Sequence, residues 1–288
     1  MIFFQLLING LIAGAIYALV ASGFSLIYST NKFVHFAHGG VIVLSAYFLY
    51  WIFSEIGLDF YIAVLFTVLF STLLGYLLDK FFYNPFRLKK ASASILLVAS
   101  IALLILSESI VLLLFGADVK TIDFIENNQG LEIGGAIITF LQIIIVLVSA
   151  ALFLGLYFLM KKTRAGKAMR AVADNKEVAE IVGISSEKIY SQSFAIGSAI
   201  AGVAAILISL EQNITPTMGT GLMIKGFTGA IIGGVGSVPG AILGSLLLGL
   251  VENFGIWFLP SGYKDAIAFT LLFAFLLFRP QGILGIKK

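Results

Sequence analysis

The sequence predicts an all-α, polytopic integral membrane protein that forms a single transmembrane domain over residues 1–288. Of the 288 residues, 60% are hydrophobic and only 11% are charged, and the mean hydropathy is +1.06. A soluble core could not bury so much apolar surface. The apolar residues also gather in runs that approach the length needed to cross hydrocarbon, about 20 residues.

Seven apolar runs are candidate membrane spans by length, and each is expected to be a helix because an isolated strand cannot satisfy its backbone in lipid. These runs are 2–28, 39–54, 60–82, 93–115, 136–160, 191–210 and 263–279. The stretch 222–258 is long enough for two crossings, although glycine and proline interrupt it. We expect about eight spans. The first half of the stretch 222–258 is short, and the count changes if this half does not cross the membrane.

The basic residues predict the orientation, because Lys and Arg accumulate in cytosolic loops. If the polar loop 161–190 is cytosolic, alternation places most other basic residues on the same side: Lys32, Lys80, Arg87, Lys89, Lys90, Arg279, Lys287 and Lys288. Only Lys120, Lys225 and Lys264 remain on or near the other side. We therefore expect the N-terminus outside and the C-terminus in the cytosol of a cell inner membrane protein.

Composition also excludes several classes of function. The chain has no cysteine, so disulfides, thiolate catalysis and cysteine-type zinc sites are excluded. The net charge of +3 is explained by the basic residues of the expected cytosolic loops. Nucleic-acid binding is excluded, because the sequence has no basic face interleaved with aromatic residues. The first basic residue is Lys32, so the first apolar run lacks the positive start of a cleaved signal peptide and is expected to stay.

The segment 161–190 is a polar island in an otherwise apolar chain. Asp174 followed by Glu177 is a helix-start signal and Gly183 is a stop signal, which predicts a short helix over Asn175–Val182. A helix of about two turns is marginal alone. One of its sides is apolar, with Val178, Ile181 and Val182. That side would dock into a partner's groove; the alternative is a helix lying on the bilayer surface.

Small residues recur every four positions on two spans, at Gly10, Gly14, Ala18 and Ser22 and again at Gly240 and Gly244. Such spacing lets helix backbones approach closely in lipid, which predicts helix packing. A translocation path lined by these helices is the alternative.

The Gly-rich segment 226–244 predicts a broken hairpin. Its glycines would leave backbone groups unpaired unless they are buried in protein or line a wet cavity. Gly233, Gly234, Gly236 and Pro239 are therefore candidates for a substrate path or gate; a tight cytosolic turn between packed helices is the alternative. The segment is not a nucleotide cradle, because no Lys-Ser or Lys-Thr follows it.

Two carboxylates fall at membrane depth, Glu108 and Glu252, and such groups are functional candidates by default. Glu252 continues the small-residue face, so it either takes part in the path or gate or hydrogen-bonds a neighbouring helix. His35 and His38 form a pair without a third ligand, a poor metal site, and are expected to be ordinary loop residues after the first span.

Four segments carry a family resemblance: 8–40 (INGLIAGAIYALVASGFSLIYSTNKFVHFAHGG), 166–184 (GKAMRAVADNKEVAEIVGI), 225–252 (KGFTGAIIGGVGSVPGAILGSLLLGLVE) and 263–285 (YKDAIAFTLLFAFLLFRPQGILG). Together they resemble the branched-chain amino-acid permeases of ABC importers, the LivH type in particular. One departure is His35, where the family has Asn. The fourth and fifth spans match by hydrophobicity alone, so nothing is transferred to Glu108.

The resemblance implies the membrane subunit of an ABC importer that moves branched-chain amino acids by alternating access. It implies four partners: a second related permease, two cytosolic ATPases and an external solute-binding protein. The chain itself is then no enzyme and binds no cofactor, since the ATPases bind ATP. The resemblance also makes the loop helix the element that couples to the ATPases, with these candidate residues: Arg170, Asp174, Glu177, Val178, Ile181, Val182 and Gly183.

Other functions stay open at this stage. A proton-coupled secondary transporter would use Glu108 and Glu252 as proton carriers but would leave the ordered polar loop unexplained. An ABC permease for another small solute, such as urea or an amide, would have the same architecture. An intramembrane enzyme lacks any paired nucleophile and base.

Overall fold

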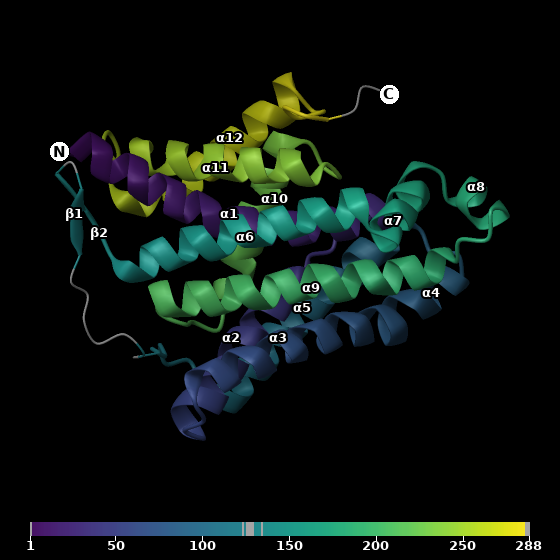
Figure 1. Cartoon of the computed structure of the whole chain (residues 1–288), viewed down its shortest axis with the longest axis horizontal. Coiled ribbons are helices and arrows are strands. Elements are labelled where there is room, and N and C mark those ends of the chain that lie inside the picture. Colours follow the sequence, from purple (N-terminus) through teal and green to yellow (C-terminus); the bar gives the residue numbers. More distant parts are fainter. Residues whose placement is uncertain (1, 123, 125–129, 134, 286–288) are drawn as a thin grey trace.

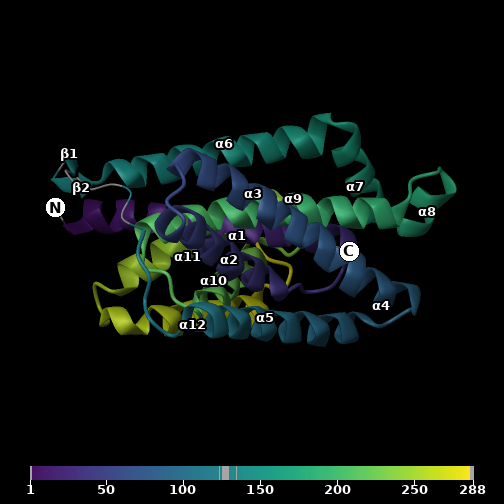
Figure 2. The same ribbon diagram turned by 90° about the horizontal axis from the view of Figure 1, so that it is seen from below.

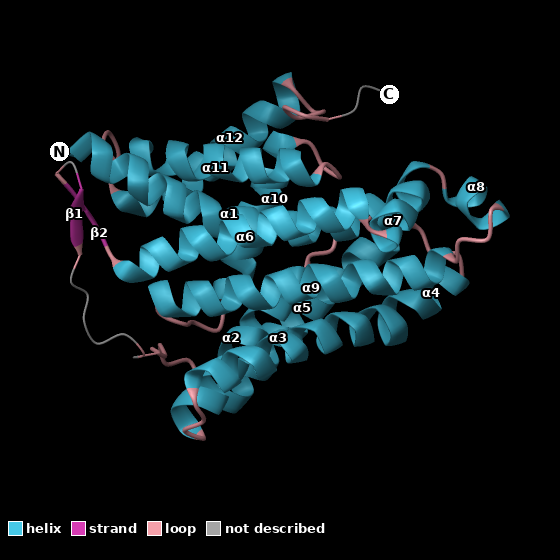
Figure 3. Cartoon of the chain, viewed as in Figure 1, coloured by secondary structure: helices cyan, strands magenta, loops and turns pink. Residues whose placement is uncertain are grey.

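The computed structural model describes residues 2–285 except 123, 125–129 and 134. Lys287 and Lys288, used above for orientation, lie outside these residues. The described part is an elongated bundle of helices with one two-stranded sheet (Figure 1, Figure 3). The predicted all-α membrane fold is confirmed, since eight of the described helices are long and apolar enough to cross a membrane.

The helix bounds are α1 (Ile2–Asn31), α2 (Ala37–Tyr50), α3 (Phe60–Leu77), α4 (Asn84–Leu88), α5 (Ala93–Phe115), α6 (Phe140–Lys162), α7 (Arg164–Asp174), α8 (Lys176–Ile181), α9 (Ser186–Glu211), α10 (Met218–Gly233), α11 (Val238–Gly255) and α12 (Lys264–Phe278). Most of the helices are joined by short connections, whereas the connection from α5 to α6 is long and contains the two strands. Wider π-helical turns extend α2 over Trp51–Glu55 and join α3 to α4 over Leu78–Tyr83.

The two chain ends lie at opposite ends of the bundle, with the N-terminus near the small sheet and the C-terminus toward α8 (Figure 1). We refer to these as the N-terminal end and the α8 end. A chain with its ends on opposite sides must pass along the bundle an odd number of times. The eight long, apolar helices of the described residues confirm the expected count of about eight spans, and the shorter α10, with 16 residues, supplies the further passage that the opposite ends require.

Several helix starts are fixed by side-chain caps. Thr139 and Gln142 form a reciprocal capping box that starts α6. The span predicted from residue 136 therefore begins later, because Ala136–Ile138 forms strand β2, paired with β1 (Leu131–Ile133). Asp59 caps α3 in a similar way, accepting hydrogen bonds from the backbone of Tyr61 and Ile62.

The centre of the bundle is formed by α1, α2 and α9, and α1 is almost wholly buried beyond its first two turns. In Figure 2 α1 and α2 lie between α6 on one edge and α5 and α12 on the other. The helices α3, α5, α6 and α12 expose many large apolar side chains, as expected for surfaces that face lipid or another membrane subunit.

Gly10 and Gly14 lie where α1 crosses α11. A Cβ atom at Gly14 would lie 2.9 Å from Leu246 Cα, and one at Gly10 would lie 3.0 Å from Leu250 Cα. Ala18 and Ser22 continue this run of small residues and are fully buried. The backbones are thus close enough that larger residues at the two glycines would force the helices apart.

The polar segment 161–190 is mostly helical. Helix α6 ends at Lys162, α7 follows, and α9 begins at Ser186, five residues before the expected start at 191. The short helix α8 matches its predicted position, but Asn175 rather than Asp174 caps it, by accepting a hydrogen bond from the Val178 backbone. Asp174 is instead the last residue of α7. Gly183 lies just after helix α8 and has a φ of +86°, a backbone conformation that favours glycine.

Candidate functional site

The α8 end presents a small apolar surface on a projecting helix. Helix α8 lies beyond the end of the bundle (Figure 1), and Val178, Ile181 and Val182 are 54%, 83% and 68% exposed. Ala179, on the opposite side of the helix, is buried. Exposed apolar residues at a tip are costly to solvate and suit a partner's groove.

Helix α7 connects this tip to the bundle. Its buried residues Met169 and Val172 pack toward the core, and the helix contacts α1, α6 and α9. The other predicted coupling residues Arg170, Asp174 and Glu177 are all exposed on this end of the protein. The sequence did not reveal α7 as a separate helix.

A charged cluster joins α4 to the first turn of α9. Arg87 donates to Asp79 at 2.7 Å and to Glu187 at 2.8 Å, and its guanidinium lies 4.8 Å from the Tyr190 ring centre. Ser191 donates to the other Asp79 oxygen at 2.6 Å. Asp79 is fully buried, so this cation offsets a charge that would otherwise be expensive to bury.

The Gly-rich segment is a tight turn between two continuous helices, α10 and α11, and it lies at the α8 end near Tyr28 and Ser29 of α1. The chain is therefore not broken inside the bundle, as a discontinuous span would be. Pro239 lies in the first turn of α11, where its missing N–H costs nothing.

Three glycines make this turn possible in different ways. Gly234 and Gly236 have φ of +110° and +91°, a region that side chains disfavour. Gly233 touches the Gly240 carbonyl, so it has no room for a Cβ. The C-terminal tail closes over the turn, since Ile283 and Leu284 donate backbone hydrogen bonds to Ile232 and Gly233 at 2.8 and 2.9 Å.

Glu252 belongs to a charged cluster near the N-terminal end. Its carboxylate is fully buried, accepts a hydrogen bond from Tyr17 at 2.9 Å and lies 3.5 Å from the Lys225 ammonium. Lys225 also lies 3.2 Å from Asp265. The cluster ties together α1, α10, α11 and α12, and the residues Tyr17, Lys225 and Asp265 were missed as site residues. The signal was Lys225 itself, an ionisable group within an apolar run.

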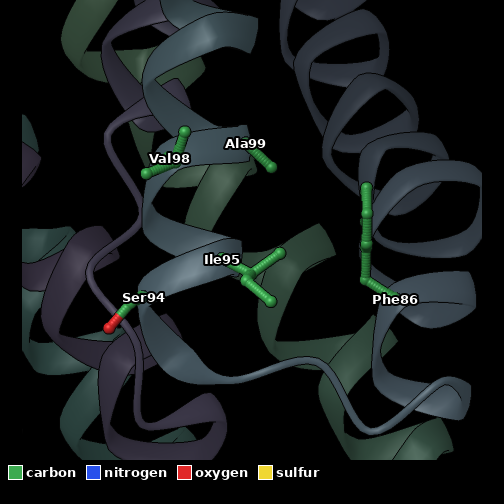
Figure 4. A pocket seen from close by; sticks show the side chains of 5 residues that line it. All are labelled: Phe86, Ser94, Ile95, Val98 and Ala99. Atoms are coloured by element: carbon green, nitrogen blue, oxygen red, sulfur yellow. The ribbon is translucent and has the colours of Figure 1, made fainter.

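A polar cavity of about 580 Å³ adjoins this cluster. Tyr17, Lys225, Lys264 and Asp265 line it together with the α9–α10 connection, and Glu252 lies behind Lys225. A second hollow, of about 410 Å³, lies between α4 and α5 and is lined by Phe86, Ser94, Ile95, Val98 and Ala99. Figure 4 shows that these side chains offer one hydroxyl and no charge, so this hollow has little to bind a polar solute.

Glu108 has a structural partner. One of its oxygens accepts hydrogen bonds from the Thr220 backbone N–H at 3.0 Å and from the Thr220 hydroxyl at 2.8 Å. Thr220 is in the first turn of α10, so the carboxylate of α5 caps a different helix. Helix N-termini leave N–H groups unpaired and favour a negative charge.

Both histidines are buried: His35 lies in the connection between α1 and α2, as expected of a loop residue, whereas the expectation is wrong for His38, which is helical. His35 is paired with the Tyr83 hydroxyl at 2.9 Å and stacks edge-on against Phe194. His38 is in the first turn of α2, against Gly23 of α1, which leaves room for the imidazole ring. Large aromatic neighbours, not solvent, surround this turn.

A bundle of membrane-length helices with a charged cavity at one end and the projecting helix α8 at the other defines a polytopic membrane protein. Comparison with known proteins specifies the class further. Residues 6–276 match the family described as branched-chain amino acid transport system / permease component. The chain belongs to this family, which confirms the resemblance noted in the sequence.

Two relatives are similar over nearly their full length. The high-affinity branched-chain amino acid transport system permease protein BraD of Pseudomonas aeruginosa is 35% identical, covering 98% of this chain and 96% of its own. The corresponding permease protein LivH of Escherichia coli is 32% identical with the same coverage.

One solved structure has a similar fold: PsaBC from Streptococcus pneumoniae in complex with Fab. It has a TM-score of 0.53 and 12% identity, covering 95% of this chain and 91% of that chain. At this identity the likeness concerns the fold alone.

Proposed function

We propose that this chain is the permease subunit of an ABC importer for branched-chain amino acids, working by alternating access in the inner membrane. Its partners would be a second related permease, two cytosolic ATPases and an external solute-binding protein. The N-terminal end would face outward and the α8 end the cytosol. Family membership supports the transport class, and the basic residues support the orientation.

The single observation that carries the proposal is the exposed apolar side of α8. Helix α8 stands outside the bundle, where the predicted topology is cytosolic, and its apolar residues have no cover in the described chain. Docking of such a helix in an ATPase groove would bury this surface. Because α7 packs against α1, α6 and α9, movement of the docked helix would reach the spans.

The proton-coupled alternative gains no support from its two candidate carriers. Glu108 is held as a helix cap, and Glu252 is held by Lys225 and Tyr17. A different cargo, such as urea or another amide, remains the competing proposal, because the relatives' substrates are properties of those proteins.

The test is uptake by the complete complex reconstituted in vesicles. We expect leucine, isoleucine and valine to accumulate only with ATP and the ATPases present, and to do so after a protonophore removes the proton gradient. The chain reconstituted alone is the matched control. Uptake by that control driven by a pH gradient would overturn the ABC assignment, and ATP-driven uptake of urea without leucine would overturn the cargo.

A further inference from the structure

We propose that the charged cavity at the N-terminal end is a binding site for a zwitterion, in which Lys225 faces the carboxylate and Asp265 the ammonium group of a free amino acid. This inference rests on the proposed function for the direction of transport. It goes further by assigning the site and the chemical feature of the cargo that the permease itself recognises.

The first argument is the balance of charge. The cavity is lined by two cations, Lys225 and Lys264, and one anion, Asp265, while Glu252 lies directly behind Lys225. The four formal charges cancel, so the region as a whole favours neither a strong anion nor a strong cation. Groups of both signs lie close enough to suit a solute that is neutral overall but carries both charges.

The second argument is that the lining ion pair is free to open. Lys225 and Asp265 are 3.2 Å apart, but the Asp265 side chain is 73% exposed. Lys225 is only 17% exposed, so Asp265 is the solvated member of the pair, and its hydration offsets part of the attraction between the two charges. A carboxylate and an ammonium on one ligand would therefore replace this contact at small cost, whereas the buried pair of Lys225 with Glu252 would stay in place and orient the lysine.

The third argument is the rest of the lining. Ile208, Met218 and Leu222 supply apolar surface on one part of the wall, and Gln212, Asn213 and Thr215 supply uncharged polar groups at the α9–α10 connection. The lining therefore combines apolar surface with several polar and charged groups, and such placed polar groups fix the orientation of a small molecule in its site. This lining suits an amino acid with an aliphatic side chain. An amide such as urea carries no charge, so it would form an ion pair with neither Lys225 nor Asp265.

The chain contains no cysteine, so a single introduced thiol reports on the cavity. Gly221 lines the cavity, and a Cβ placed there meets no atom within 4 Å. We would label Gly221→Cys with a polar thiol reagent in the reconstituted permease–ATPase complex without binding protein, and read the modification on this chain by mass. Gly262→Cys is the matched control, since it has equal space and lies outside the cavity lining.

We expect saturating leucine to slow labelling of Gly221→Cys about tenfold, because occupancy near nine-tenths leaves about a tenth of the sites open. Isoamylamine, which lacks the carboxylate, 4-methylvalerate, which lacks the ammonium group, and urea should each give less than about twofold protection at the same concentration. Gly262→Cys should be labelled equally under all conditions. Equal protection by all four solutes, or by none, would overturn the zwitterion site.

Two further variants test the assigned charges. Asp265→Asn should remove most leucine protection while the exposed side chain leaves folding unchanged, and Asp118→Asn, at an exposed acid that does not line the cavity, should not. Lys225→Met combined with Glu252→Gln removes the cation without leaving a bare buried charge and should also abolish protection. Unchanged protection in both would overturn the assignment. ATP-driven leucine uptake by the unmodified complex tests the proposed function separately.

Discussion

At the scale of single residues, the carboxylates of Glu108 and Glu252 link neighbouring helices through hydrogen bonds and an ion pair. Glu108 caps α10 from α5, and Glu252 joins α11 to α1 and α10 through Tyr17 and Lys225. A carboxylate in an apolar region is expensive unless such partners exist. Their geometry therefore gives direct expectations for substitution.

Glu108→Ala should destabilise the protein by about 1–2 kcal/mol, as expected when a helix N-terminus loses its cap. Glu108→Gln keeps an acceptor oxygen for Thr220 and should retain most of the stability and the ATP-driven uptake. Thermal unfolding of the purified complex and uptake in vesicles measure the two effects. Complete loss of transport in Glu108→Gln with normal stability would instead favour a proton carrier.

Lys225→Met should be strongly destabilising, because it leaves the Glu252 carboxylate buried beside one hydroxyl only. Breaking one side of a buried ion pair costs about 3–5 kcal/mol. The double variant Lys225→Met with Glu252→Gln should recover much of that loss. The measurement is the shift in unfolding midpoint of the complex, and a single variant as stable as the unmodified protein would contradict the arrangement.

At the scale of elements, α8 is a short helix beyond the end of the bundle that exposes apolar side chains. Val178→Asp or Val182→Asp would place a charge in a desolvated contact and should weaken ATPase binding by several kcal/mol, on the order of a hot-spot truncation of about 2–4 kcal/mol. The ATPases should then fail to co-purify while the permease still inserts.

The matched control for α8 is Lys176→Ala. Lys176 is half exposed and lies 3.9 Å from Glu180, a surface pair worth about 0–1 kcal/mol. This variant should keep bound ATPases and near-normal uptake. If the two aspartate variants behave like Lys176→Ala, the helix does not couple to the ATPases.

The glycine turn between α10 and α11 gives a graded prediction. Gly233→Val and Gly234→Val should abolish transport, since the first meets the Gly240 backbone and the second meets Gly285 N at 2.7 Å. Gly236→Ala has no atom nearer than 3.6 Å and should cost only its strained φ, about 1–2 kcal/mol. Uptake and complex assembly are measured together, and wild-type uptake by the two valine variants would show that the turn tolerates larger residues.

The sequence predicted the spans and the position of α8 well, because hydrophobic runs and a glycine stop such as Gly183 are local signals, although Asn175 rather than Asp174 caps that helix. The start of α6 was missed because a short hairpin competes for the same apolar residues. The charged cluster could not be predicted, since Tyr17 and Glu252 are 235 residues apart and their pairing depends on how α1 packs on α11. The role of Glu108 was missed for the same reason: its partner Thr220 is 112 residues away.

At the scale of the whole molecule, the nine passages give a topology that can be measured. In the cysteine-free chain, thiols placed at Gly262 and Asn213 should react from outside intact cells, and thiols at Lys176 and Arg279 only from the cytosolic side. An impermeant thiol reagent applied to oppositely oriented vesicles makes the comparison. Labelling of Arg279→Cys from outside would mean that α10 does not cross.

The two ends of α10 have a consequence for how the protein is made. Its first-turn N–H group is satisfied by Glu108, from a helix synthesised long before it. Its last carbonyls, at Ile232 and Gly233, are satisfied by Ile283 and Leu284, which follow α12 and are therefore synthesised after two further helices. With 16 residues and several glycines, α10 is a weak candidate for independent insertion.

Helix α10 is thus a late element of biogenesis, which gains its C-terminal partners only after α11 and α12 have entered the membrane and the tail has folded back. The same helix carries Lys225 and Gly221 in the cavity wall. A chain cut before Ile283 would keep the eight long helices of the described residues but would leave the carbonyls at the C-terminal end of α10 without these two partners.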